Sequence, residues 1–452
     1  MVGKVYSIDL KTSQYNNYNT AVPVVKSADT KFSPVVNKNQ SFGNNISNPA
    51  FCASFRTELS SNEEKHMYNQ LLNISDKTTR KQLNQLLKNG VLLNNNSNDK
   101  SSTLENLYKI ASTQRAQGLN SVNILKETVS ILADPHVITQ QFGNIPTPYH
   151  SQVTAITPDA DVEHSGTCVA SSIEFNLAQK HPAEFARFAQ GLSSPQMSVE
   201  KIIKLSNLAD NTLDAVWLLN AFEVPFEAKD FNEAKLKFAP DKNAIIRAHI
   251  QTVDRDRLER SSVDVLMQST LMQIGSQQSY NSLNDKRAGK FNQNDKGLIE
   301  FEKTFTESVV EDKNKISMTY QKVDENGKFV GYETDFNTMK RQITDALKLN
   351  ENVIIGYTQV DNTNTIINGH EITITSVKAD RNGKLIFVCN DTDDNVSRPI
   401  EYSEDYLLPK IHHAALPQSV VANDVNFTES WVEGLNNYKQ LKNQQNQQNY
   451  AA

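Results

Sequence analysis

Cysteine is scarce in this sequence, and long apolar runs are absent. Cysteine occurs only at Cys52, Cys168 and Cys389 among 452 residues. A small, odd number of cysteines does not describe a disulfide framework. No run of about 18 apolar residues occurs, so we expect no membrane span. The N-terminus has no apolar core after a basic start, which argues against a standard secretory signal. We therefore expect a soluble protein, cytoplasmic or exported by a route without a standard signal peptide.

A strong excess of charge of one sign is also missing. The chain has 46 Lys and Arg residues against 52 Asp and Glu residues, a net charge of −6. This mild charge argues against a nucleic-acid-binding surface, and we expect no nucleic-acid partner. A hydrophobic content of 38% with 22% charged residues is ordinary for a globular chain. The length exceeds what one compact core accommodates, so two or three domains are expected.

The N-terminal third divides into two segments of different character. Residues 1–57 are polar and lack a clear period, which predicts disorder. Residues 58–140 show four amphipathic segments at helical spacing, and they predict a small helical bundle. Ser61 to Glu64 and Ser102 to Glu105 both have the pattern of a capping box. Gly90 occupies the position of a glycine that ends a helix.

The remaining chain, residues 141–435, is predicted to form a second domain of the α+β class. Its clearest part is an amphipathic helix at 335–349, a buried strand at 353–357 and a hairpin that turns at Asn382-Gly383. Residues from about 230 to 330 are polar, and we interpret them as a helical insertion with mobile loops. The Gln/Asn-rich tail, residues 436–452, is predicted to be disordered. Further helices are expected at 167–188, 199–209 and 212–222.

Three residue types in a fixed order predict a thiol-based catalytic site. Cys168 lies where a loop containing Gly166 turns into a helix, and a helix N-terminus favours the thiolate. His370 follows Gly369 at the start of the first hairpin strand and is the candidate base. The second strand ends at Asn390 and Asp391, either of which could orient the imidazole. A regular ladder would give that role to Asn390, whereas a β-bulge would give it to Asp391.

This order resembles the papain superfamily of cysteine peptidases. The passage from Lys340 to Asp391 is similar to bacterial members of the bacteriocin-leader-peptidase-like kind. The resemblance implies a papain-like domain in which Cys168 is the nucleophile and His370 its base. It also implies an oxyanion-hole glutamine in a short motif before the cysteine. Gln152, in Pro148-Tyr149-His150-Ser151-Gln152, is the matching residue.

Other clusters have simpler interpretations than catalysis or metal binding. Residues 391–395 carry alternate acidic side chains but lack the glycine and terminal glutamate of an EF-hand, so a solvated turn is favoured. Asp161, Glu163, His164 and Cys168 could be drawn as a zinc site, but no paired Cys-x-x-Cys supports it. We expect no metal and no cofactor. The pair His412-His413 is interpreted as a surface feature. Cys52 and Cys389 are interpreted as buried structural thiols.

The expected function is therefore a thiol-dependent hydrolase, a cysteine peptidase or amidase that acts on a peptide or protein substrate. The same Cys-His-Asn/Asp triad would also serve an acyl transferase or an effector, if an amine resolves the acyl-enzyme. A further alternative is a binding or scaffold protein that keeps the fold without activity.

Overall fold

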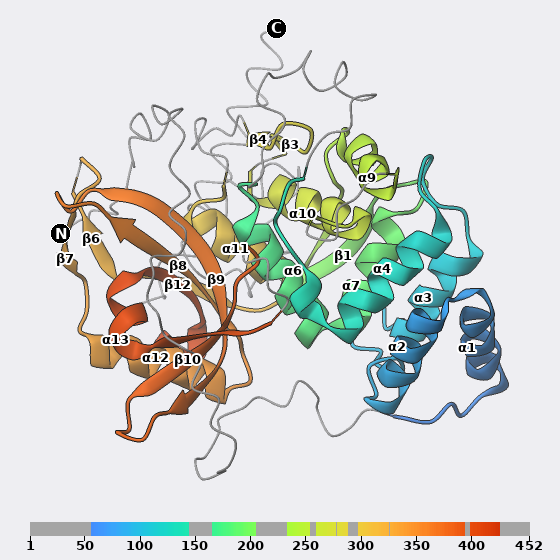
Figure 1. The fold of residues 1–452 in the computed structure, drawn as a ribbon, viewed down its shortest axis with the longest axis horizontal. Coiled ribbons are helices and arrows are strands. Elements are labelled where there is room, and N and C mark those ends of the chain that lie inside the picture. Colours follow the sequence, from blue (N-terminus) through green and yellow to red (C-terminus); the bar gives the residue numbers. More distant parts are fainter. Residues whose placement is uncertain are drawn as a thin grey trace, which may run out of the picture.

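The computed structural model describes residues 56–143, 165–204, 233–253, 259–276, 278–287, 297–324, 326–393 and 398–424. Helices gather on one side of the molecule and a six-stranded antiparallel sheet lies on the other (Figure 1). The chain therefore combines helices with an antiparallel sheet, and the expected α+β class is confirmed. None of the helices in these ranges is long and apolar enough to cross a membrane.

The first helical group contains the four helices expected from the sequence. They are α1 (Asn62–Ile74), α2 (Lys77–Lys88), α3 (Thr103–Ser112) and α4 (Ser121–Ala133). Both predicted capping boxes are present, at Ser61 and at Ser102. Gly90 adopts a φ of 74°, which is strained for any residue with a Cβ atom.

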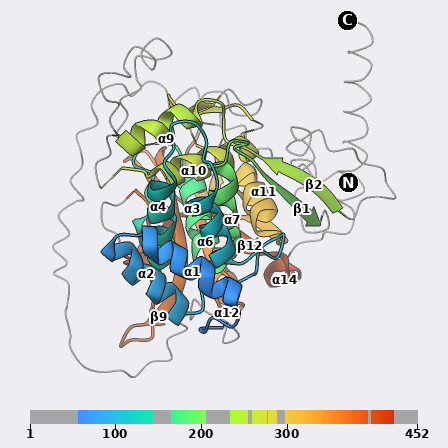
Figure 2. The same cartoon turned by 90° about the vertical axis from the view of Figure 1, so that its right-hand side faces the viewer.

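The four helices do not form a separate unit. α3 and α4 pack against α6 (Cys168–Lys180), α7 (Pro182–Leu192) and α10 (Ser262–Gly275), and α1 and α2 pack on α3 and α4 (Figure 2). Leu71, Leu107 and Leu132 belong to the same continuous hydrophobic cluster as Ile173 and Leu271. The boundary drawn at residue 140 therefore does not coincide with a break in the packing.

Residues 199–330 differ most from the sequence prediction. A strand, β1 (Val199–Lys204), stands where a helix was expected from residue 199, and it pairs with β2 (Glu233–Phe238). The segment predicted as a helical insertion is not an addition to the fold. It contributes α9 (Ala244–Val253), the central helix α10, and α11 (Glu300–Glu311). It also supplies β5 (Lys315–Thr319), an edge strand of the main sheet. The helix expected at 212–222 lies outside the described residues, as do the segments 1–55 and 425–452.

The main sheet has the strand order β11-β10-β9-β8-β12-β5, and all neighbours in it are antiparallel. Its other strands are β8 (Val353–Val360), β9 (Ile366–Ala379), β10 (Leu385–Asn390), β11 (Ile400–Ser403) and β12 (Ile411–Pro417). Both faces are covered. Ile354 packs into the helical core, whereas Val353 and Ile355 pack with side chains of α12 (Phe336–Lys348) on the opposite face.

Short elements complete the described chain. They are η2 (Pro135–Val137), β3 (Tyr280–Asn281), β4 (Lys286–Arg287), β6 (Gln321–Val323), β7 (Phe329–Tyr332), α13 (Glu404–Leu407), η6 (Leu408–Lys410) and α14 (Gln418–Val421).

Candidate active site

Cys168 is the first residue of α6, and its side chain is half-buried. The loop before it is held from three sides. Ser165 Oγ donates to the carbonyl of Gln140 at 2.6 Å, and Thr167 Oγ1 donates to Gln268 Oε1 of α10 at 2.8 Å. The Gly166 amide donates to the carboxylate of Asp285. The thiol therefore starts a helix whose position is fixed by its surroundings, and the first-turn amides of that helix give it a positive end.

His370 lies inside β9 rather than at its start, because the strand begins four residues earlier, at Ile366. It stands opposite Tyr357 of β8, and the two rings meet edge to face at 5.6 Å. His370 Nε2 lies 2.7 Å from Asp391 Oδ1, and the two side chains are 11% and 10% exposed. The thiol of Cys168 is hydrogen-bonded to the same imidazole. Since Nε2 faces Asp391, Nδ1 is the ring nitrogen left for the thiol.

A β-bulge determines which of Asn390 and Asp391 contacts His370, a choice that the sequence alone left open. The pairing of β9 with β10 shifts register between Val388 and Cys389, so that Thr375 has no partner on β10. Asp391 then meets His370, and Asn390 does not. Asn390 Oδ1 instead lies 2.8 Å from Nδ1 of His136. The regular-ladder expectation for Asn390 is therefore wrong, and the reason is one extra residue on the neighbouring strand.

The electrostatics of His370 favour the charged ring. Burial alone would lower the pKa of His370, but the adjacent Asp391 carboxylate and the Cys168 thiol raise it well above its ordinary value. In the same way, burial would raise the pKa of Asp391, yet the His370 ring and the Asp393 amide lower it. The site is thus arranged to hold an imidazolium ion between a carboxylate and a thiol.

Residues 134–143, here called the strap, join the two halves of the site. The Gln140 amide donates to the Thr392 carbonyl at 3.0 Å, and Thr392 Oγ1 donates to Gln140 Oε1 at 3.2 Å. Thr392 Oγ1 also lies 2.6 Å from Ser171 Oγ in the first turn of α6. The loop that carries Asp391 is therefore tied directly to the helix that carries Cys168. The strap has no periodic pattern in the sequence, because its contacts are made by isolated polar side chains.

The other residues singled out in the sequence fall into three groups. Gln152, Asp161, Glu163, His164 and Cys52 lie outside the described residues. Cys389 is fully buried, and burial raises the pKa of its thiol, as expected for a structural cysteine. In the acidic segment 391–395, Asp391 is committed to His370. A hollow of about 750 Å³ lined by residues of β2, the loop 239–243, α10 and β3 contains none of the site residues.

The interpretation of His412-His413 as a surface pair is wrong. His413 is only 7% exposed and lies in β12, where it contacts Glu371 of β9. Successive residues of a strand face opposite sides, so one of two adjacent histidines in a covered sheet points inward. That rule, applied to the strand 411–417, was the signal that could have found the burial of one of the two histidines.

No protein-family model matches the chain, and neither a curated protein nor a solved structure matches it significantly.

Proposed function

We propose that the chain is a papain-like cysteine hydrolase, with Cys168 as nucleophile, His370 as general acid and base, and Asp391 as the residue that orients the imidazole. The observation that carries the proposal is the line of contacts from Asp391 through His370 to the thiol at the start of α6. This arrangement is typical of an activated nucleophile, because a structural cysteine does not require a charged imidazole beside it.

The chemistry follows from the charges. A proton held on His370 leaves Cys168 as a thiolate, which attacks the carbonyl carbon of an amide. The C–N bond breaks as the imidazolium passes its proton to the leaving amine, and a thioester of Cys168 remains. Neutral His370 then takes a proton from water, whose oxygen attacks the thioester. The products are a carboxylic acid and the free thiol. An amine in place of water would give a new amide.

Stabilisation of the oxyanion has a source on the chain itself. The amides at the start of α6 lack partners within the helix and lie next to the sulfur that forms the new bond. They are suited to the negative charge that develops on the substrate oxygen. Gln152, the residue indicated by the resemblance, would add a side-chain donor. Peptides and proteins are the proposed substrates, since amide carbonyls fit this arrangement.

Labelling with a peptidyl vinyl sulfone tests the proposal, because this trap reacts with activated thiolates. Incubation at pH 6, followed by peptide mass mapping, should identify Cys168 as the modified residue, and His370→Ala should abolish the labelling. Peptide libraries analysed by mass spectrometry should then reveal cleavage that Cys168→Ala lacks. Failure of Cys168 to react faster than a free thiol would instead favour a non-catalytic protein with this fold.

A further inference from the structure

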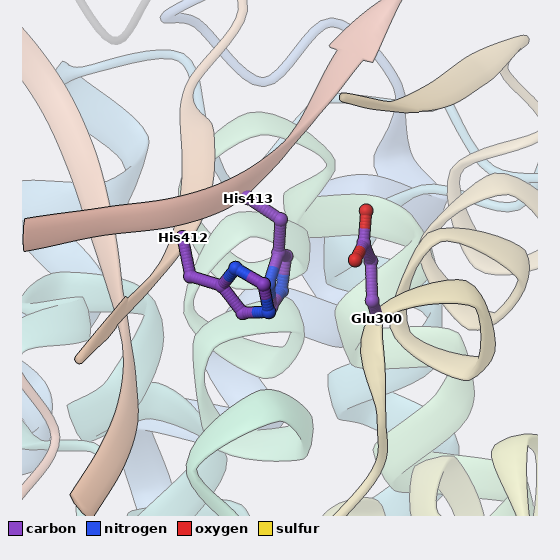
Figure 3. Close-up of side chains that lie close together, drawn as sticks. All are labelled: Glu300, His412 and His413. Carbon is purple, nitrogen blue, oxygen red and sulfur yellow. The ribbon is translucent and has the colours of Figure 1, made fainter. Parts of the chain in front are cut away.

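A second group of chemically active side chains lies at the junction of α11, β5 and β12, and the proposed thiol chemistry does not use it. It consists of Glu300, the first residue of α11, with His412 and His413 of β12. Figure 3 shows the two imidazole rings beside the Glu300 side chain. One nitrogen or oxygen atom from each of the three residues can be chosen so that all lie within 4.8 Å of one another.

The backbone brings these side chains together by a bulge. Adjacent residues of a regular strand point to opposite faces, so His412 and His413 would normally diverge. The pairing of β12 with β8 shifts register between Ile411 and His413, and His412 has no partner on β8. The two rings then lie 5.3 Å apart, at 73° to one another. Bulges that redirect a side chain in this way are concentrated next to functional sites.

Neither imidazole has its hydrogen-bonding capacity satisfied. Within the part of the chain that the structure describes, Nδ1 of His412 and both ring nitrogens of His413 are buried and make no hydrogen bond. His413 is more than nine-tenths buried. Buried polar atoms without partners are uncommon, and an unplaced ion is one of the ordinary explanations.

We propose that Glu300, His412 and His413 bind a divalent transition-metal ion, with zinc preferred, at a site separate from the thiol. Two imidazoles and one carboxylate form a donor set that zinc accepts, and a water molecule would complete four-coordination. Glu300 and His412 remain partly exposed, which gives the ion a route of entry.

The surroundings fit the requirements of such a site. Glu371 Oε1 lies 3.0 Å from Nε2 of His413, and its other oxygen lies 3.2 Å from Nζ of Lys303. The Glu371 carboxylate lies beside Nε2, so the opposite nitrogen, Nδ1, would be the one that faces a metal ion. Glu300 is oriented in turn. Its Oε1 accepts from the hydroxyls of Ser317 at 2.6 Å and Thr319 at 2.7 Å, which leaves Oε2 for the metal.

The charges around the site also suit a dication. Glu300 and Glu371 together carry two negative charges, and Lys303 contributes one positive charge beside Glu371. A divalent ion would offset the excess, and it would also explain why both rings converge on Glu300.

Zinc titration of metal-free protein tests the proposal, with Cys168→Ala as the parent. This substitution removes the thiol that could bind zinc with His370. The parent should bind one zinc ion per chain, measured by competition with a fluorescent zinc chelator. His412→Ala and Glu300→Gln should each weaken that binding at least tenfold. Because these side chains are partly exposed, circular dichroism should show both variants folded.

His66→Ala, which removes an exposed histidine of α1, is the matched control and should bind zinc as the parent does. As a second readout, cobalt(II) should give the intense visible absorption of a four-coordinate ion in the parent and lose it in His412→Ala. Absence of binding to the parent, or unchanged affinity in folded His412→Ala and Glu300→Gln, would overturn the proposal. None of these measurements depends on hydrolase activity. The metal-site proposal can therefore be refuted without affecting the hydrolase proposal, and the reverse also holds.

Discussion

Replacing Asp391 by Asn isolates the carboxylate that holds His370 in its charged form. The substitution keeps the shape of the side chain and an oxygen that can accept from Nε2, and it removes the negative charge. Asp391 and His370 are both about nine-tenths buried, so water compensates little for the loss. We expect the proton to leave the imidazole and return to the Cys168 thiol.

The size of the effect follows from the 2.7 Å contact between the two residues. A hydrogen bond to a charged group contributes about 1.5–3 kcal/mol. This free energy corresponds to about 1–2 pH units on His370, or a shift of about 10- to 100-fold from the ion pair towards the neutral pair. The thiolate fraction at mildly acidic pH should fall by up to that factor.

The assay is the rate of Cys168 alkylation by iodoacetamide between pH 4 and 10, followed by mass spectrometry. The native protein should show a plateau of high rate from mildly acidic pH. In Asp391→Asn the plateau should drop about 10- to 100-fold, and the rate should rise only at alkaline pH, as for a free thiol. Asn390→Ala is the matched control, because Asn390 contacts His136, and it should keep the plateau. A plateau that survives in Asp391→Asn, or that disappears in Asn390→Ala, refutes the assigned roles.

Four further substitutions test the site and the packing around it. Cys168→Ala should remove all hydrolase activity in peptide assays and leave the Tm nearly unchanged, since the side chain is half-buried; retained activity would contradict the proposed nucleophile. Gly356→Ala should lower the free energy of unfolding in urea by about 1–3 kcal/mol, because the new methyl group would overlap the His413 ring. Lys315→Met should cost about 3–5 kcal/mol in the same assay, because buried Glu307 loses its ion-pair partner and Glu311 and Glu351 keep only Lys313. His181, whose pKa is lowered to about 4 chiefly by burial, binds its proton more readily when unfolded, so stability should fall as the pH drops from about 6.5 to about 4. His181→Gln should lose less stability over that range, and an equal loss in both proteins would show that His181 has no part in it.

Local signals in the sequence predicted the helices well where side chains bond to their own backbone. The capping boxes at Ser61 and Ser102 are such signals, since each is complete within four residues. The strand β1 was misread for the opposite reason. Its inward-facing residues are Val199, Lys201 and Ile203, and the lysine in the middle conceals the alternation. Lys201 can be buried because Glu184 of α7 lies 3.6 Å away. The sequence of the strand itself does not indicate this ion pair.

The central helix α10 was concealed in a similar manner. It is buried on every side, yet Asp264, Gln268 and Ser269 give it a polar composition. Gln268 is accommodated because its amide donates to the Thr139 carbonyl at 2.9 Å and to Glu174 at 3.0 Å. These partners are distant in sequence, so a buried helix looked like a polar insertion.

The order of the candidate site residues was readable, but the choice between Asn390 and Asp391 was not. Which of two adjacent residues faces a neighbour depends on the register of the partner strand. The extra residue at Thr375 sets that register for β9 and β10, and the shift beside His412 does the same for β12. Both shifts arise from pairing, and a single strand read alone does not reveal them.

The strap has a consequence for the order in which the protein assembles. His370 and Asp391 are 21 residues apart in one hairpin, whereas Ser171 and Thr392 are 221 apart and His136 and Asn390 are 254 apart. Contacts between near neighbours form at a small cost in chain entropy, and distant ones form late. During synthesis, Cys168 leaves the ribosome well before the hairpin that contains its partner imidazole. Under the proposed mechanism, Cys168 would therefore meet its partner imidazole only after the helices and the sheet have docked.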